Sequence, residues 1–223
     1  MYFSRIIADY SCSEHLKKDL SNPYSTHKVL WKLFSESFEQ KRNFLYRREL
    51  PIKEFACFYV LSSTPPLNPN KDWSIETKTF QPILIPNQIL HFKLRVNAVR
   101  RYKSDLHKPL RIDIVDHFLL KNHNHSDISR ELATHQATVQ WMSEQAEKNG
   151  FEIFEKTIKI ENYSKTKLIQ KNIKKSNHIT LSEIDLSGII RISSPDLFLK
   201  RLYDGFGHGR SFGCGLMMIK KNP

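Results

Sequence analysis

Two sets of short strand-like runs, each interrupted by helix signals, limit the fold of this chain more than any other feature. The clearest run is 89–99, where Phe92, Leu94 and Val96 alternate with basic or polar residues. A two-residue period of this kind is typical of a strand with one buried face. Further strands are predicted at 2–9, 54–62, 74–83, 151–160 and 179–193.

Three helices are predicted between these strands. Apolar residues recur at helical spacing from Pro23 to about Gln40, and Asn22 and Pro23 supply a cap and a first helical residue. A second helix is expected over 135–149, closed by Gly150. A third is expected over 195–204, opened by Ser194 and Pro195 and stopped by Gly205.

This order of elements, roughly β-α-β-β followed by α-β-β-α-β, predicts an α+β protein with two tandem ferredoxin-like (RRM-like) domains. We place the first domain at 1–100 and the second at 134–223. Residues 101–133 are rich in charge and histidine and poor in apolar residues, so we interpret them as a linker or loop. The aromatic RNP sequence is not visible, which argues against ordinary base stacking on the sheets.

The charge balance points to a polyanion partner. The chain has 35 Lys and Arg against 23 Asp and Glu, a net charge of +12 and a pI near 9.6. No apolar run reaches the ~18 residues of a membrane span, and Met1 is followed by a strand-like segment where a secretion signal needs an apolar run. We therefore expect a cytoplasmic protein without a membrane partner. The three cysteines form no CxxC pair, which indicates neither a disulfide framework nor a thiolate metal site.

Tyr24 and His27 are candidate catalytic residues. If the helix begins at Pro23, they lie three residues apart and share a face. The amino end of a helix favours a nearby phosphate and a neutral imidazole. RNA carries its own nucleophile, the 2′-hydroxyl, so proton transfer and positioning suffice to cleave it. The alternative is that both residues only decorate a helix start.

The tail holds five of the seven glycines, between Gly205 and Gly215. It matches neither Walker A nor GxGxxG, and it precedes a strand where those motifs precede a helix. We predict a loop whose amides, with His208 and Arg210, approach an RNA backbone. The alternative is a tight helix-to-strand connection.

The stretch between Asn162 and Ile179 contains a run of lysines and no acidic residue. The lysines are Lys165, Lys167, Lys171, Lys174 and Lys175. They are predicted to bind the phosphates of an RNA stem, the alternative being a solvated hairpin. Arg95, on the polar face of the strand at 89–99, is a further RNA-contact candidate.

Metal chemistry is not predicted. His117, His123, His125 and His135 come without a cysteine pair or an HExxH motif. The scattered carboxylates, such as Asp113 and Asp116, do not form the cluster that a two-metal nuclease needs. We expect no metal and no small-molecule cofactor.

Four segments, in order, resemble the CasE family, the endoribonuclease subunit of the Cascade complex in type I-E CRISPR systems. They are MYFSRIIAD, KKDLSNPYSTHKVLWKLF, FKLRVNAV and GFGHGRSFGCGLM. The NPYxxH block and the glycine tail are the specific parts. The family often reads RANP where this chain has Arg95 to Ala98, so the turn there is expected to differ.

The resemblance implies metal-independent cleavage of a CRISPR precursor RNA at the 3′ base of its stem-loop, leaving 2′,3′-cyclic phosphate and 5′-hydroxyl ends. His27 and Tyr24 occupy the family's catalytic positions, and Lys28 or a member of the lysine run would stabilise the transition state. The family also retains its product and joins other Cascade subunits. Two alternatives stay open: a non-catalytic RNA-binding subunit of the same complex, and a generic basic RNA-binding module.

Overall fold

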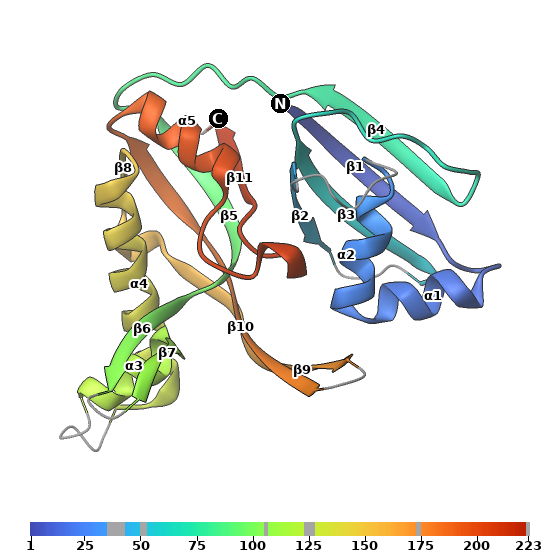
Figure 1. Cartoon of the computed structure of the whole chain (residues 1–223). Helices are drawn as coiled ribbons and strands as arrows, with labels where there is room; N and C mark the ends of the chain where they lie inside the picture. Colours follow the sequence, from blue (N-terminus) through green and yellow to red (C-terminus); the bar gives the residue numbers. More distant parts are fainter. Residues whose placement is uncertain (35–42, 50–52, 105–106, 123–127, 173–174, 222–223) are drawn as a thin grey trace. The chain divides into compact units, whose positions relative to one another are not determined.

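The computed structural model describes residues 1–34, 43–49, 53–104, 107–122, 128–172 and 175–221, and for 101–110 and 169–178 it describes the backbone alone (Figure 1). The chain forms two compact units. The first contains Met1–Ile83 and Gly209–Leu216, and the second contains Leu84–His208 and Met217–Pro223. Each unit is described by itself below.

The first unit is a four-stranded antiparallel sheet with two helices. Its elements are β1 (Tyr2–Asp9), α1 (Glu14–Ser21), α2 (Pro23–Trp31), β2 (Phe44–Arg48), β3 (Phe55–Ser62), β4 (Trp73–Thr79) and the short 3-10 helix η2 (Arg210–Phe212). The strand order is β2-β3-β1-β4. This is the order of a ferredoxin-like sheet, in which the first and third strands are central.

Alternation along β1 explains why the helices cover one face of this sheet. Ile6 and Ala8 are fully buried, whereas Arg5, on the opposite face, is exposed. The buried face packs against Leu20 of α1 and Leu30 of α2 in a single apolar cluster. Burial of this cluster against the sheet holds α2 in place, since helices of this length are marginal by themselves.

The second unit contains the complete β-α-β-β-α-β pattern. Its elements are β5 (Ile89–Asn97), β6 (Val99–Ser104), β7 (His107–Asp113), α3 (Ile114–Lys121), α4 (Arg130–Lys148), β8 (Phe151–Ile153), the 3-10 helix η1 (Glu155–Thr157), β9 (Lys159–Asn172), β10 (Lys175–Ile192), α5 (Pro195–Asp204) and β11 (Met217–Lys221). The main sheet has the order β11-β5-β10-β8, with β9 paired to β10. If β5, β8, β10 and β11 are numbered 1 to 4 along the chain, this order is 4-1-3-2, which is again the ferredoxin-like order.

Three aromatic residues, from β8, from α5 and from the segment after α5, pack together in the core of the second unit. The rings of Phe151 and Phe198 meet at 5.4 Å between centroids, and Phe206 packs on Phe151 at 6.1 Å. Gly207, at φ +65°, lies so close to β5 that an added Cβ would be 2.4 Å from a methyl group of Val96. One glycine of the tail is thus required for packing inside this unit.

The predicted α+β class with two ferredoxin-like domains is confirmed by these two sheets. The predicted strand at 2–9, the helix start at Pro23 and the helix 195–204 also match the structure. The expected end of the first helix, near Gln40, lies outside the described residues.

The compact units have other boundaries than the expected ranges 1–100, 101–133 and 134–223. Strand β5 pairs with β10 and β11, so residues from Leu84 onward lie in the second unit. Within 101–133 the chain forms β6, β7 and α3. Alternation reveals a strand but not its partner, which is why the pattern alone assigned β5 to the preceding domain.

Candidate active site and nucleic-acid interface

The amino end of α2 is fixed by three short-range contacts. The side-chain oxygen of Asn22 accepts a hydrogen bond from the Tyr24 N–H at 2.9 Å, as expected for an N-cap. The Thr26 N–H donates to the Asn22 carbonyl at 2.9 Å, and the buried Thr26 hydroxyl donates to the Leu20 carbonyl at 3.3 Å. These contacts tie the first turn of α2 to the end of α1.

Tyr24 and Lys28 lie together on the exposed side of this helix. The Tyr24 side chain is exposed, with 40% of its surface accessible. The Lys28 ammonium lies 4.8 Å from the centroid of the Tyr24 ring, one helical turn further on. A phenol in the first turn and a cation in the last turn are therefore side by side on one face of α2, and the unpaired amides of the first turn also attract anions.

His27 lies on the same helix but is half-buried. Its imidazole packs edge-on against Trp31 at 5.3 Å and stacks on Phe44 at 5.8 Å between ring centroids. Two aromatic side chains thus restrict the orientation of the ring. A general acid or base benefits from such restriction, because proton transfer requires a defined geometry.

The tail from Gly209 to Leu216 belongs to the same unit as α2. Residues of η2 lie against α2, and the Tyr46 hydroxyl donates to the Ser211 carbonyl at 3.0 Å. Gly213 has φ +85°, and a Cβ there would lie 3.2 Å from the Tyr46 ring. The NPYxxH helix and the glycine tail, nearly 190 residues apart, are therefore neighbours, and half-buried Arg210 comes with the tail.

The remaining tail candidate, His208, lies in the second unit. His208 is exposed, and its backbone N–H donates to the Asn97 carbonyl at 3.1 Å. Gly207 and Gly209 flank it at positive φ. The glycine cluster thus serves both units: its first part packs on β5 and its second part packs on Tyr46.

The predicted RNA-contact residues Arg95 and Lys165 are held by carboxylates. The Arg95 guanidinium donates from Nε to Oδ1 of Asp185 and from Nη2 to Oδ2, both at 2.9 Å, across the strand pair β5-β10. The Lys165 ammonium pairs with Asp116 and lies 5.8 Å from the Tyr163 ring centroid.

The other lysines lie on the hairpin β9-β10 or beyond what is described. Lys167 is exposed on β9, opposite Thr180, and it shares a ribbon face with Lys165 because the two positions are two residues apart on one strand. Lys171 is on β9 opposite Ser176, and Lys175 begins β10 opposite Asn172. Lys174 lies outside the described residues.

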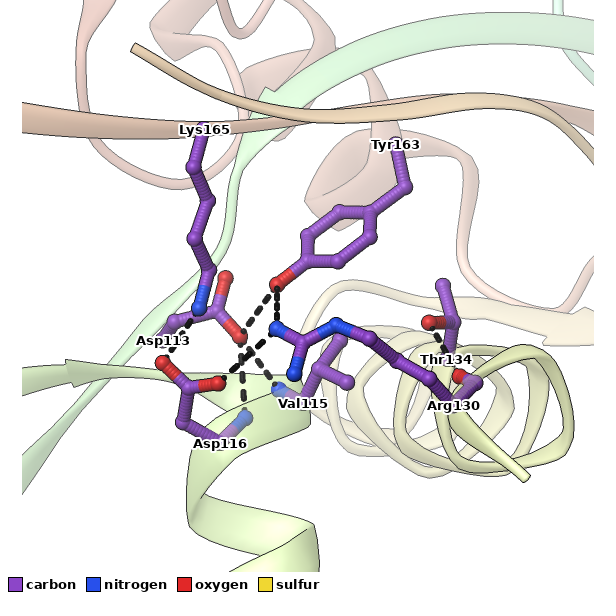
Figure 2. Close-up of polar contacts among 7 residues, drawn as sticks. All are labelled: Asp113, Val115, Asp116, Arg130, Thr134, Tyr163 and Lys165. Atoms are coloured by element: carbon purple, nitrogen blue, oxygen red, sulfur yellow. Dashed lines mark hydrogen bonds and ion pairs between the residues drawn. The ribbon is translucent and has the colours of Figure 1, made fainter. Parts of the chain in front are cut away.

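Lys165 is part of a polar cluster that was not predicted from the sequence. Asp113 at the end of β7, Asp116 of α3, Arg130 of α4 and Tyr163 of β9 are its other members (Figure 2). Burial raises the pKa of Asp116, but the hydrogen bonds and charges of Lys165 and Arg130 outweigh it and leave that pKa below its ordinary value. A sequence signal for this cluster was Asp113 as an N-cap before Ile114 and Val115, the first residues of α3.

The family model described as CRISPR associated protein matches residues 1–221 of this chain. The chain belongs to that family. The CRISPR-associated endoribonuclease Cse3 of Thermus thermophilus is 23% identical to it over 234 residues, covering 98% of this chain and 99% of the relative. The predicted membership of the CasE type is confirmed.

Two solved structures show the same fold. A CRISPR endoribonuclease Cse3 bound to a 19-nucleotide RNA has a TM-score of 0.75 at 22% identity, with 99% of this chain and 100% of that chain covered. A chain of a CRISPR RNA-guided surveillance complex in a pre-nicking state has a TM-score of 0.70 at 17% identity, with full coverage of both. At these identities the likeness shows the fold, including the two ferredoxin-like units.

Metal ligands do not gather in the described part of this family member. Across the residues that the structure describes, no group of three or more His, Cys, Asp and Glu side chains is arranged to hold a metal ion, and His123 and His125 lie outside those residues. Within the same residues, no helix has the length and apolar character needed to cross a membrane.

Proposed function

We propose that this protein is a metal-independent endoribonuclease that cleaves CRISPR repeat RNA at the 3′ base of its stem-loop. The observation that carries the proposal is the grouping of Tyr24, His27 and Lys28 on the short helix α2, next to the Arg210 tail. The family match and the RNA-bound relative support the choice of substrate.

The proposed reaction is attack of a 2′-hydroxyl on the adjacent phosphorus, which expels the 5′-oxygen of the next nucleotide. The products are a 2′,3′-cyclic phosphate and a 5′-hydroxyl. His27 takes or gives the proton, and a single positioned acid or base contributes ~10²–10⁴-fold. Tyr24 orients the phosphate or shares the proton transfer. Lys28 or Arg210 offsets the charge that develops in the pentavalent transition state.

The RNA stem is proposed to contact the hairpin lysines, Lys165, Lys167, Lys171, Lys174 and Lys175, together with His208. A two-stranded ribbon can follow the phosphates of a duplex stem, and Lys165 and Lys167 lie two residues apart on one face of this ribbon. Arg95 contributes only if a phosphate shares its guanidinium with Asp185.

The protein is further proposed to act in the cytoplasm, to retain the mature guide RNA and to join other Cascade subunits. The similarity to a chain of an RNA-guided surveillance complex supports this assignment. A second candidate function, a non-catalytic RNA-binding subunit of the same complex, is favoured by one observation: His27 is half-buried between Trp31 and Phe44 rather than fully presented to solvent.

The test is incubation of the protein with the repeat RNA in excess EDTA, followed by analysis of the product ends. We expect a single cut at the 3′ base of the stem and a cyclic phosphate that periodate and phosphatase treatments distinguish from a simple phosphate. A substrate with one 2′-deoxy nucleotide 5′ of the cut should bind equally well and stay whole. Binding without cleavage of the all-ribose RNA would favour the non-catalytic candidate, and cleavage of the 2′-deoxy RNA would exclude the proposed nucleophile.

A further inference from the structure

The outer part of the β9-β10 hairpin stands away from the main sheet. Strand β10 pairs with β5 only from Glu183 to Arg191, whereas it pairs with β9 from Lys175 to Ser187. Beyond Ser182, whose N–H donates to the side-chain oxygen of Asn97 at 3.1 Å, no third strand joins the ribbon among the strands that the structure describes. Figure 1 shows the hairpin extending from the second unit. Isolated two-stranded hairpins are marginal in water, so the direction of this one depends on its base.

The base is held by five side chains, which we name the root cluster: Asp113, Asp116, Arg130, Tyr163 and Lys165 (Figure 2). The Tyr163 hydroxyl donates to Asp113 at 3.1 Å and accepts from Arg130 at 3.2 Å. Arg130 also donates to one Asp116 oxygen at 3.0 Å, while Lys165 pairs with the other. Both residues that β9 contributes, Tyr163 and Lys165, lie where the ribbon leaves the sheet.

The carboxylates in the root cluster are themselves fixed. The Asp113 side chain caps α3, accepting the N–H groups of Val115 at 2.7 Å and of Asp116 at 3.0 Å. Arg130 is the first residue of α4, whose start is capped by the Ser129 hydroxyl. The base of the hairpin is therefore tied to the beginnings of two helices, which are rigid points of the second unit.

We infer that Asp116 and Tyr163 are positioning residues for RNA recognition: they hold the base of the lysine-bearing hairpin so that its cations meet the stem in one orientation. The inference rests on the proposed function. Neither residue needs to touch RNA. A pre-oriented ribbon binds more tightly because less conformational freedom is lost when the complex forms.

The effect on affinity distinguishes positioning from simple charge. Replacing Asp116 with Asn removes a negative charge next to two cations, and on electrostatics alone this tightens binding to a polyanion. Loss of positioning instead weakens RNA binding by the same variant. Tyr163→Phe keeps the ring but removes the hydroxyl's hydrogen bonds to Asp113 and Arg130 without changing the net charge, so any loss of affinity in this variant is due to positioning and not to charge.

The experiment measures repeat-RNA affinity and single-turnover cleavage for the full chain and its D116N, D116E and Y163F variants. The matched control is D204N, the same charge change at an exposed position near the end of α5. We expect D116N and Y163F to raise the Kd by about fivefold, the size expected from losing a partly exposed ion pair or hydrogen bond. Cleavage at saturating RNA should stay within about twofold, since α2 lies in the other unit. D116E should restore most of the affinity, and D204N should bind as well as the wild type or better.

Hydrogen exchange of the hairpin amides, measured without RNA, provides the second readout. We expect faster exchange in D116N and Y163F for residues 164–168 and 179–182, with unchanged thermal unfolding of the whole chain. Unchanged exchange, or a D116N variant that binds RNA as tightly as the wild type or more tightly, would overturn the inference and leave the endonuclease proposal intact. A wild-type protein that neither binds nor cuts the repeat would refute the proposed function, and the exchange data would still decide whether the root cluster holds the hairpin.

Discussion

The environment of His27 combines two properties that a proton-transfer residue needs. The ring is restricted by Trp31 and Phe44, and it belongs to the first turns of a helix whose amino end attracts phosphate. Tyr24 is more exposed and pairs with a cation, so the phenol is better suited to direct contact with the substrate. This division of roles predicts different kinetic defects for the two side chains.

Replacing His27 with Ala should lower the cleavage rate at least ~10²-fold, the lower bound for a positioned acid or base, with repeat-RNA affinity changed little. Single-turnover kinetics with excess enzyme measure the rate, and a filter-binding assay measures the affinity. His15→Ala is the control, because His15 is an exposed histidine on α1 in the same unit. Full activity of the His27 variant would end the proposed mechanism.

At the scale of elements, the part of the glycine tail from Gly209 to Leu216 packs beside the candidate catalytic helix in the first unit. Its last part packs on the Tyr46 ring and its 3-10 helix lies against α2. A side chain at Gly213 would face both an unfavourable backbone angle and a ring at 3.2 Å. The segment is thus bound to the first unit by geometry that only glycine allows.

Gly213→Ala should therefore reduce the free energy of unfolding by about 1–3 kcal/mol, combining left-handed backbone strain with crowding of a packed ring. Urea denaturation of the full chain measures the loss. Tyr46→Phe, which removes only the hydroxyl bonded to Ser211, should cost about 1 kcal/mol. If the Ala variant is as stable as the wild type, the close packing of the tail on Tyr46 is not a source of stability.

At the scale of the whole molecule, the net charge of +12 makes RNA affinity dependent on salt. A plot of log K against log salt concentration should be linear with a negative slope, because each neutralised phosphate releases counterions. Lys167→Gln should make the slope shallower by about 0.7–0.9, the value for one phosphate contact. Lys148→Gln, at an exposed position at the end of α4, is the control and should leave the slope unchanged. Equal slopes for both variants would remove Lys167 from the RNA interface.

Local signals were sufficient for much of this architecture. Alternation identified β1 and β5, and the Asn22–Pro23 and Pro195 signals located the starts of α2 and α5 to the residue. These features depend on neighbours in the chain, such as a cap that bonds two residues ahead or side chains that alternate between faces. Spacing alone also placed Tyr24 and His27 on one short helix, but it did not indicate that Tyr24 is exposed beside Lys28 while His27 packs between Trp31 and Phe44.

Contacts between distant segments were decided only by the tertiary structure. No local pattern indicates that β5 pairs with β10, that residues 209–216 join the first unit, or that Asp116 pairs with Lys165. Strand pairing and ion pairs depend on which buried surfaces find one another, and the free energy of that choice is spread over the whole core. The sequence by itself determined the elements, the basic character and the candidate catalytic pair. The folded chain decided that residues 209–216 lie beside the candidate catalytic helix and that acidic side chains contact the base of the basic hairpin.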